Sequence, residues 1–133
     1  MKYLLDTNIC IYFLMKKPII IDKIKDLEND ELSISCFNLA ELLYGAYNSE
    51  SVEKNLERVR FIENTISVIA LDNKAIDIFA STKAMLRKQG NLIDDMDLLI
   101  GAIALSNQLI LVTNNEKHFS RIPDLQIENW TKE

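Results

Sequence analysis

The chain has 133 residues, of which 48% are hydrophobic and 26% are charged, and its net charge is −5. These values exclude a disordered chain, and the length is typical of one folded unit, so we expect residues 1–133 to form a single domain. The acidic balance argues against a protein that holds nucleic acid through a broad basic face.

The sequence contains no run of 18 apolar residues, and Asp6 interrupts the N-terminal apolar segment before it could form a signal peptide. We therefore expect a cytoplasmic protein without membrane contact. Cys10 and Cys36 are far apart and form no C-x-x-C motif. A zinc site or disulfide framework is therefore not expected, and both residues are interpreted as buried thiols.

The first half of the chain begins with an apolar run at residues 1–5, which predicts a buried strand that ends on Asp6. Residues 9–14 have helical spacing, Pro18 interrupts it, and residues 19–27 resume as an amphipathic helix. Residues 31–35 alternate between apolar and polar side chains, which predicts a second strand. Residues 38–47 and 52–66 then predict two consecutive helices.

The second half continues the alternation with a predicted third strand at residues 67–71. Asp72 or Asn73 can cap a helix that runs to about Gln89, where Gly90 ends it. Residues 94–105 predict a helix that is apolar on nearly all sides and therefore buried, and residues 109–112 and 125–128 predict the last two strands. The pattern indicates an α/β fold, a three-layer α/β/α sandwich around a mainly parallel sheet of four to five strands.

Polar groups from four segments are expected at one edge of this sheet. Asp6 follows the first strand, Glu41 is on the helix after the second, Asp97 is on the buried helix, and Asn115 follows the fourth strand. Parallel α/β folds bind ligands at the carboxyl ends of their strands. The four segments therefore predict a functional site.

The first two acids also have structural interpretations. Asp6 can cap the helix that follows it, with Asn8 as a competing cap. Asn38 and Glu41 are three positions apart and resemble a capping box, although Ser or Thr is the usual first residue. These interpretations stand beside the functional one.

Asp97 enters a helix whose next eight residues carry no charge, so its carboxylate is expected close to apolar surface. A buried carboxylate has to be paired, protonated or bound to a metal. Asp94 and Asp95 suit the positive end of the helix dipole, and no cation is near them in the sequence. Crowded acids without a cation predict a divalent metal site.

Oxygen ligands select hard ions, so Mg²⁺ is the expected cofactor, and Mn²⁺ can substitute for it. Such an ion activates water and stabilises the charge that develops during attack on a phosphodiester. Other chemistries lose support because His118 is the only histidine, interpreted here as a surface residue, and no G-x-S-x-G motif is present. The three glycines form neither G-x-G-x-x-G nor a P-loop.

The chain resembles PIN-domain ribonucleases, specifically the VapC-type toxins of bacterial type II toxin-antitoxin systems. Four blocks carry the resemblance, in the order in which the family has them, and Trp130 follows them near the end of the chain. The blocks are residues 3–8, 34–45, 97–104, and 112–115 with 119–123.

The resemblance implies a Mg²⁺- or Mn²⁺-dependent endoribonuclease with an acidic core of Asp6, Glu41 and Asp97. Asp6 and Asp97 would be direct metal ligands, and Glu41 would bind a metal or hold its water. Thr7, Asn8 and Ser35 would support this geometry through hydrogen bonds. With Asp6 as a metal ligand, capping of the first helix is left to Thr7 or Asn8.

Many family members have a fourth acid in the site, at the position where this chain has Asn115. A neutral amide compensates less positive charge than a carboxylate, so this residue weakens the case for a second ion. Asp94 or Asp95 could supply the missing charge.

The resemblance also implies partners. The substrate would be RNA, with tRNA or another structured RNA as candidates, and a small antitoxin would cover the site with its C-terminal segment. The other end of the antitoxin would bind operator DNA, and the toxin would form homodimers and hetero-oligomers with the antitoxin. Two alternatives keep the same acids: a catalytically weak PIN-like module that acts mainly through antitoxin and operator-DNA binding, and a metal-dependent DNA nuclease.

Overall fold

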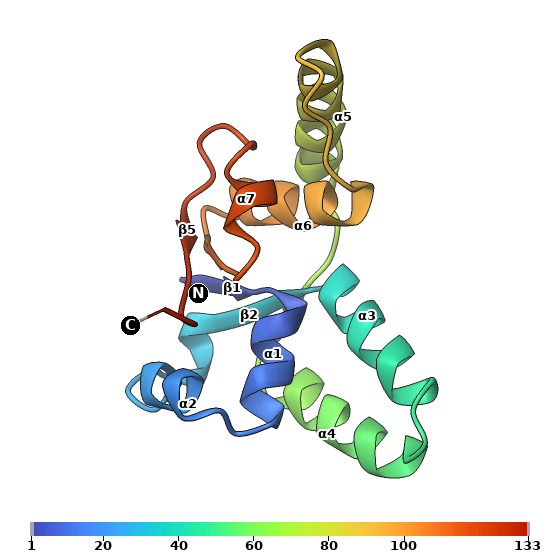
Figure 1. The fold of residues 1–133 in the computed structure, drawn as a ribbon, viewed down its shortest axis with the longest axis vertical. Helices are drawn as coiled ribbons and strands as arrows, with labels where there is room; N and C mark the ends of the chain where they lie inside the picture. The colour runs from blue at the N-terminus through green and yellow to red at the C-terminus, as the bar shows by residue number, and fades with distance from the viewer. Residues whose placement is uncertain (1, 133) are drawn as a thin grey trace.

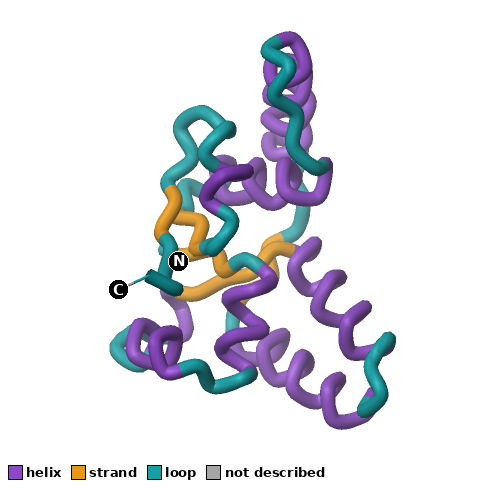
Figure 2. The backbone as a smooth tube through the Cα atoms, in the orientation of Figure 1, coloured by secondary structure: helices purple, strands orange, loops and turns teal. Residues whose placement is uncertain are grey.

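A central parallel sheet of five strands organises the protein, in a computed structural model that describes residues 2–132. Met1, included in the first predicted strand, lies outside the described residues. The strands have the spatial order β3-β2-β1-β4-β5 and are drawn in orange in Figure 2. Their bounds are β1 Tyr3–Leu5, β2 Leu32–Ser35, β3 Ser67–Ile69, β4 Ile110–Val112 and β5 Ile127–Glu128.

Helices cover both faces of this sheet, with α1 to α4 on one face and α5 to α7 on the other (Figure 1). The three-layer α/β/α arrangement predicted from the sequence is therefore confirmed. The helices are α1 Thr7–Leu14, α2 Pro18–Ile24, α3 Cys36–Tyr47, α4 Val52–Thr65, α5 Asn73–Lys88, α6 Asp95–Ser106 and α7 Glu116–Phe119, with a short 3₁₀ turn at Asn29–Glu31.

Successive residues of each strand point to opposite faces of the sheet, which divides the core in two. On β1, Tyr3 and Leu5 pack with the α1 to α4 layer, whereas Leu4 packs with the α5 to α7 layer. On β4, Val112 and Leu111 divide in the same way. Because both faces are covered, β1 and β4 are apolar on both sides, as their continuous apolar runs predict, whereas β2 buries Ser33 and Ser35 on one of its sides.

The ends of several elements differ from the prediction by a few residues. The second strand begins at Leu32 because the residues before it form the 3₁₀ turn, and the third ends at Ile69. The long fifth helix agrees closely, since Asp72 caps it through Ala75 N at 2.8 Å and Gly90 ends it with φ at +67°. Helix α7 was not predicted, because four residues are too short to show a helical period.

The strand order creates a switch point between β1 and β4. The chain leaves β1 toward β2 and β3 on one side, and then returns to place β4 on the other side of β1. Where neighbouring strands have connections that leave in opposite directions, a crevice forms outside their carboxyl ends, and α/β proteins bind ligands there. Asp6 and Thr113 are the residues directly after these two strands.

Every helix within residues 2–132 is too short or too polar to cross a bilayer. Cys10 is buried, as predicted, but Cys36 is only partly buried because it begins α3 at the edge of the sheet. Both are free thiols.

The buried helix α6 should carry much of the stability of the α5 to α7 layer. Ile103 on this helix is 0% exposed, whereas Ile76 on α5 is 46% exposed. We expect Ile103→Ala to lower the free energy of unfolding by about 2–5 kcal/mol, because it leaves a cavity in a packed core. The control Ile76→Ala should change it by less than about 0.5 kcal/mol. Urea titrations measure both, and equal effects of the two substitutions would contradict this packing.

Candidate active site

A polar pocket of about 370 Å³ opens at the switch point between β1 and β4. Six residues that were predicted to belong to the site line this pocket. Asn114, which was not among the predicted site residues, lines it as well. No lysine or arginine contributes to the wall. The lining residues are Asp6, Thr7, Asn8, Glu41, Asp97, Asn114 and Asn115.

Asp6 is buried at the base of this site, with 7% of its surface exposed. Its Oδ1 accepts from the backbone N–H of Thr7 at 2.9 Å, and its Oδ2 accepts from the Thr113 hydroxyl at 2.7 Å. The Asn38 amide lies 3.4 Å from Oδ1 as a third donor. Asp6 is itself the N-cap of α1, so the expectation that Thr7 or Asn8 caps this helix is wrong. The end of β1 thus positions the Asp6 carboxylate, and the first backbone N–H of α1 fixes it through a hydrogen bond.

A buried amide, Asn38, orients the acids on the α3 side. Its Oδ1 accepts from the backbone N–H and the hydroxyl of Ser35, at 2.9 Å and 2.6 Å. The Ser35 hydroxyl oxygen in turn accepts from Asn38 N at 3.1 Å and caps α3. The predicted capping box of Asn38 with Glu41 is therefore wrong, because α3 begins two residues earlier and Ser35 pairs with Asn38. Ser35 supports the site through this amide.

Thr7 links the first acid to the second. Asn38 Nδ2 donates to Thr7 Oγ1 at 3.1 Å, and the Thr7 hydroxyl donates to Glu41 Oε1 at 2.6 Å. Glu41 is exposed on the first half of α3, where it faces the pocket. Because Ser35 and Asn38 cap α3, Glu41 takes no part in capping its own helix.

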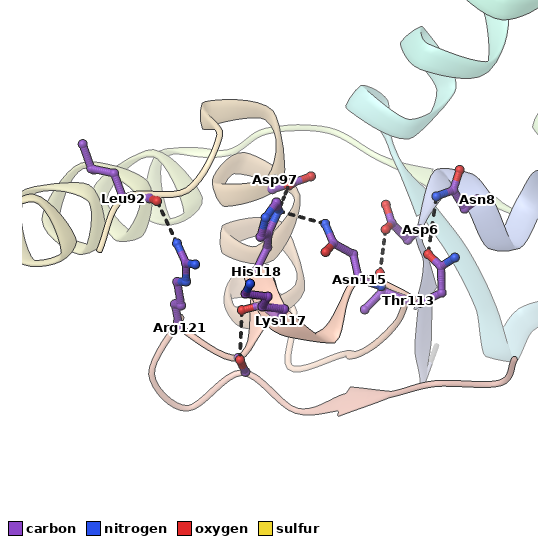
Figure 3. A network of polar contacts seen from close by, with 11 residues as sticks. Asp6, Asn8, Leu92, Asp97, Thr113, Asn115, Lys117, His118 and Arg121 are labelled. Atoms are coloured by element: carbon purple, nitrogen blue, oxygen red, sulfur yellow. Dashed lines mark hydrogen bonds and ion pairs between the residues drawn. The ribbon is translucent and has the colours of Figure 1, made fainter. Parts of the chain in front are cut away.

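Asp97 approaches the pocket from α6, in the opposite helical layer (Figure 3). Its Oδ2 lies 3.4 Å from Nδ1 of His118, a residue of α7. The same ring nitrogen lies 3.0 Å from Nδ2 of Asn115. His118 lies at the surface as predicted, with 41% of its side chain exposed, but its ring also contacts an acid and an amide of the site.

Asn115 also connects to the base of the site. Its backbone N–H donates to the Thr113 hydroxyl oxygen at 2.9 Å, and that hydroxyl donates to Asp6. At the rim, the Asn8 amide donates to Asn114 Oδ1 at 3.4 Å, and Asn114 donates to the Tyr12 hydroxyl at 3.1 Å. The rim of the pocket is thus built from neutral donors and acceptors.

The two acids before Asp97 lie outside the pocket. Asp95 forms an exposed ion pair with Lys83 of α5, with Nζ 2.9 Å from Oδ1. Asp94 precedes α6 as its N-cap, without a side-chain capping hydrogen bond. These positions agree with the structural interpretation as acids at a helix N-terminus.

Burial, together with the charges of neighbouring acids, raises the pKa values of two acids of the site. The pKa of Asp6 is raised mainly by burial, against the hydrogen bonds from Thr113 and Thr7, and the charges of Asp97 and Glu41 raise it further. The pKa of Asp97 is raised mainly by burial, while His118 opposes the shift and Asp94 adds to it. The acids are thus close enough to repel one another, which a cation would relieve.

The donor set fits a hard divalent ion. The groups that line the pocket are carboxylates, amides and a hydroxyl, all of which offer oxygen ligands. Within residues 2–132, no group of three or more His, Cys, Asp or Glu side chains is already closed around a metal position. Mg²⁺ needs no such cage, because it keeps several waters and takes one or two carboxylates. Of the three carboxylates that line the pocket, those of Asp6 and Asp97 are the least exposed.

The raised pKa of Asp6 makes stability depend on pH in a defined direction. Without metal, the stability of the wild type relative to Asp6→Asn should fall as the pH rises above 3.8, the ordinary aspartate pKa. The unfolded chain loses its proton near that pH, while the folded chain keeps it up to the raised pKa. The contribution is thus complete below 3.8 and lost as the pH passes the folded-state pKa.

Urea titrations of both proteins in EDTA, over a series of pH values, measure this difference. The comparison with Asp6→Asn cancels the carboxylates that the two proteins share. A difference that stays constant from acid to neutral pH would show that the pKa of Asp6 is not raised.

Comparison with known proteins places this geometry in a family. The model of the PIN domain matches residues 3–125. Ribonuclease VapC2 of Haemophilus influenzae is 38% identical over 130 residues, which cover 98% of each chain. The tRNA(fMet)-specific endonuclease VapC of Shigella flexneri is 35% identical over 131 residues, covering 98% of this chain and 99% of the relative.

A solved structure agrees over the same length. The crystal structure of DNA-bound VapBC from Salmonella typhimurium includes a chain that is 35% identical and covers 98% of both chains, with a TM-score of 0.90. The family match, the full-length identity and the shared fold all agree with the acid-lined pocket at the switch point. The chain therefore belongs to the PIN-domain family, among the VapC ribonucleases.

Proposed function

We propose that this protein is the toxin of a type II toxin-antitoxin system and that it cuts phosphodiester bonds of RNA in the cytoplasm. The observation that carries the proposal is the convergence of Asp6, Glu41 and Asp97, from three separate segments, on one pocket without a lining cation. The relatives named as ribonucleases support RNA as the substrate. The Shigella flexneri relative, named for tRNA(fMet), favours tRNA as the substrate class.

The proposed cofactor is Mg²⁺, with Mn²⁺ as a substitute, held by Asp6 and Asp97. When bound, such an ion activates water and stabilises the charge of the phosphodiester under attack. Asp6 is pre-oriented by Thr113 and Thr7, so little reorganisation accompanies binding. Because Asn115 is neutral, and neither Asp94 nor Asp95 lines the pocket, we propose that a single ion serves.

The remaining residues of the pocket have distinct proposed roles. Thr7 holds Glu41 through Oε1, which leaves Oε2 to accept a proton from the attacking water. Asn8 and Asn114 offer neutral hydrogen-bonding groups at the rim, suited to the phosphates and sugars of a bound strand. The acidic wall by itself repels RNA, so binding of substrate depends on the cation.

An antitoxin is the proposed protein partner, through which the complex binds operator DNA, and the toxin is proposed to form a homodimer. The DNA-bound VapBC of Salmonella typhimurium supports this assembly. Two grooves of about 310 Å³ and 890 Å³ share Leu14 and Arg58, and the smaller one also includes Glu41 of the site. A partner segment lying along them would reach the acids.

Nuclease activity is the direct test of this function. We expect Asp6→Asn and Asp97→Asn to fold normally and to lose RNA cleavage by about 10²-fold or more, because each removes a ligand of the ion. Excess EDTA should abolish cleavage by the wild type, and Mg²⁺ or Mn²⁺ should restore it. Lys88→Ala, an exposed change at the end of α5, is the matched control. Cleavage of labelled tRNA measures all of these.

The same assay separates the alternatives. Full cleavage by either aspartate variant, or by the wild type in EDTA, would contradict the metal mechanism. Cleavage of DNA in preference to RNA would favour a DNA nuclease, and absence of any cleavage would favour the catalytically weak binding module.

Neutralisation tests the proposed partner. We expect the cognate antitoxin to abolish the toxicity of the wild type on co-expression. Met15→Glu should lose this protection, because Met15 is 63% exposed and lines the smaller groove, where a charge would oppose an apolar contact. Lys88→Glu, on α5, is the control that should stay protected. Equal protection of both variants would exclude this groove as the docking surface.

A further inference from the structure

His118 occupies a position that the proposed mechanism has not used. It is the only histidine of the chain, and its Nδ1 lies 3.4 Å from Asp97 Oδ2 (Figure 3). The ring does not line the pocket and instead contacts Asp97 from the α7 side. A residue placed there can act on the site only through the acid that it touches.

The two proposed metal ligands are supported very differently. Asp6 accepts from three donors, which come from Thr7, Thr113 and Asn38. For Asp97, the contact with His118 is the one side-chain hydrogen bond or ion pair within residues 2–132. The orientation of the second carboxylate therefore depends on a single imidazole.

The ring itself is held firmly. Asn115 is the N-cap residue of α7, and its side-chain amide lies 3.0 Å from Nδ1 of the ring. The next residue, Phe119, is 0% exposed and anchors α7 in the core. Asn115 also bonds through its backbone to Thr113, which holds Asp6. The loop that fixes the first metal ligand thus also fixes the ring beside the second.

We propose that His118 is a positioning residue, which donates from Nδ1–H to Asp97 Oδ2 and so presents Oδ1 to the ion. Nδ1–H then has two acceptors, Asp97 Oδ2 and the Asn115 amide oxygen, which takes the place of the amide nitrogen 3.0 Å from the ring after a half-turn of the amide. The 3.4 Å separation is long for a hydrogen bond, and binding of a metal by Asp97 would allow it to shorten. The inference rests on the proposed metal site.

Metal affinity, measured by Mn²⁺ titration with electron paramagnetic resonance, tests the inference without an activity assay. We expect His118→Ala to weaken Mn²⁺ binding about 10- to 100-fold, as the loss of a partner that orients a metal ligand does. His118→Asn should restore most of the affinity, because its Nδ2 can take the place of the imidazole Nδ1. His118→Gln, whose amide reaches the place of Nε2 instead, should not restore it.

Lys117→Ala is the matched control, because Lys117 is the exposed neighbour of His118 on α7. It should bind Mn²⁺ as the wild type does, and thermal unfolding should show that all variants fold. Unchanged affinity in His118→Ala, or failure of His118→Asn to restore a lost affinity, would overturn the positioning role while leaving the metal site intact. Absence of Mn²⁺ binding to the wild type would overturn the proposed function and this inference together.

A second readout uses the single imidazole as a reporter. In protein labelled with ¹⁵N at histidine, Mg²⁺ should shift the ring signals of the wild type and leave those of Asp97→Asn unchanged. Ring signals that do not respond to Mg²⁺ in a wild type that binds it would contradict the coupling of His118 to the ion.

Discussion

The burial of the Asp6 carboxyl group at the base of the switch point is the constraint on which the rest of the site depends. An unpaired carboxylate in such a place is unfavourable unless hydrogen bonds or a cation stabilise it. The fold supplies the hydrogen bonds from the end of α1, from the end of β4 and from Asn38. It supplies no lysine or arginine, and it brings two more acids to the same pocket. A divalent ion in the pocket would relieve the repulsion among these acids.

Two hydrogen-bonded chains extend from Asp6 to the other acids. One passes through Asn38 and Thr7 to Glu41, and it joins β1 to α3. The other passes from Thr113 through Asn115 and His118 to Asp97, and it joins β4 to α6. The acids of both helical layers are thus tied to one buried carboxylate. This connection explains how helices on opposite faces of the sheet hold a common geometry, which catalysis by a bound ion requires.

The sequence could reveal the acids because each follows a recognisable local pattern, such as an apolar strand that ends on Asp6 or an uncharged helix that begins near Asp97. The resemblance pointed to Thr7 and Ser35 as supporting residues, but the sequence could not reveal three other residues that orient the acids, Thr113, Asn38 and His118. Thr113 is 107 residues from Asp6, and Asn38 is 32 residues away, so neither contact leaves a periodic signal. The spacing of Ser35 and Asn38 does resemble a capping box and could have corrected the start of α3. His118 lies on a helix too short to be predicted, and its contact with Asp97 depends on how α6 and α7 pack.

In the proposed metal site, Asp6 and Asp97 together hold one divalent ion in the pocket between β1 and β4. A crystal structure of the wild type soaked in Mn²⁺, with anomalous scattering used to locate the metal, tests it most directly. We expect one anomalous peak, in contact with a carboxylate oxygen of each of these two residues. A crystal that shows no peak in this pocket, or a peak bound elsewhere on the chain, would contradict it.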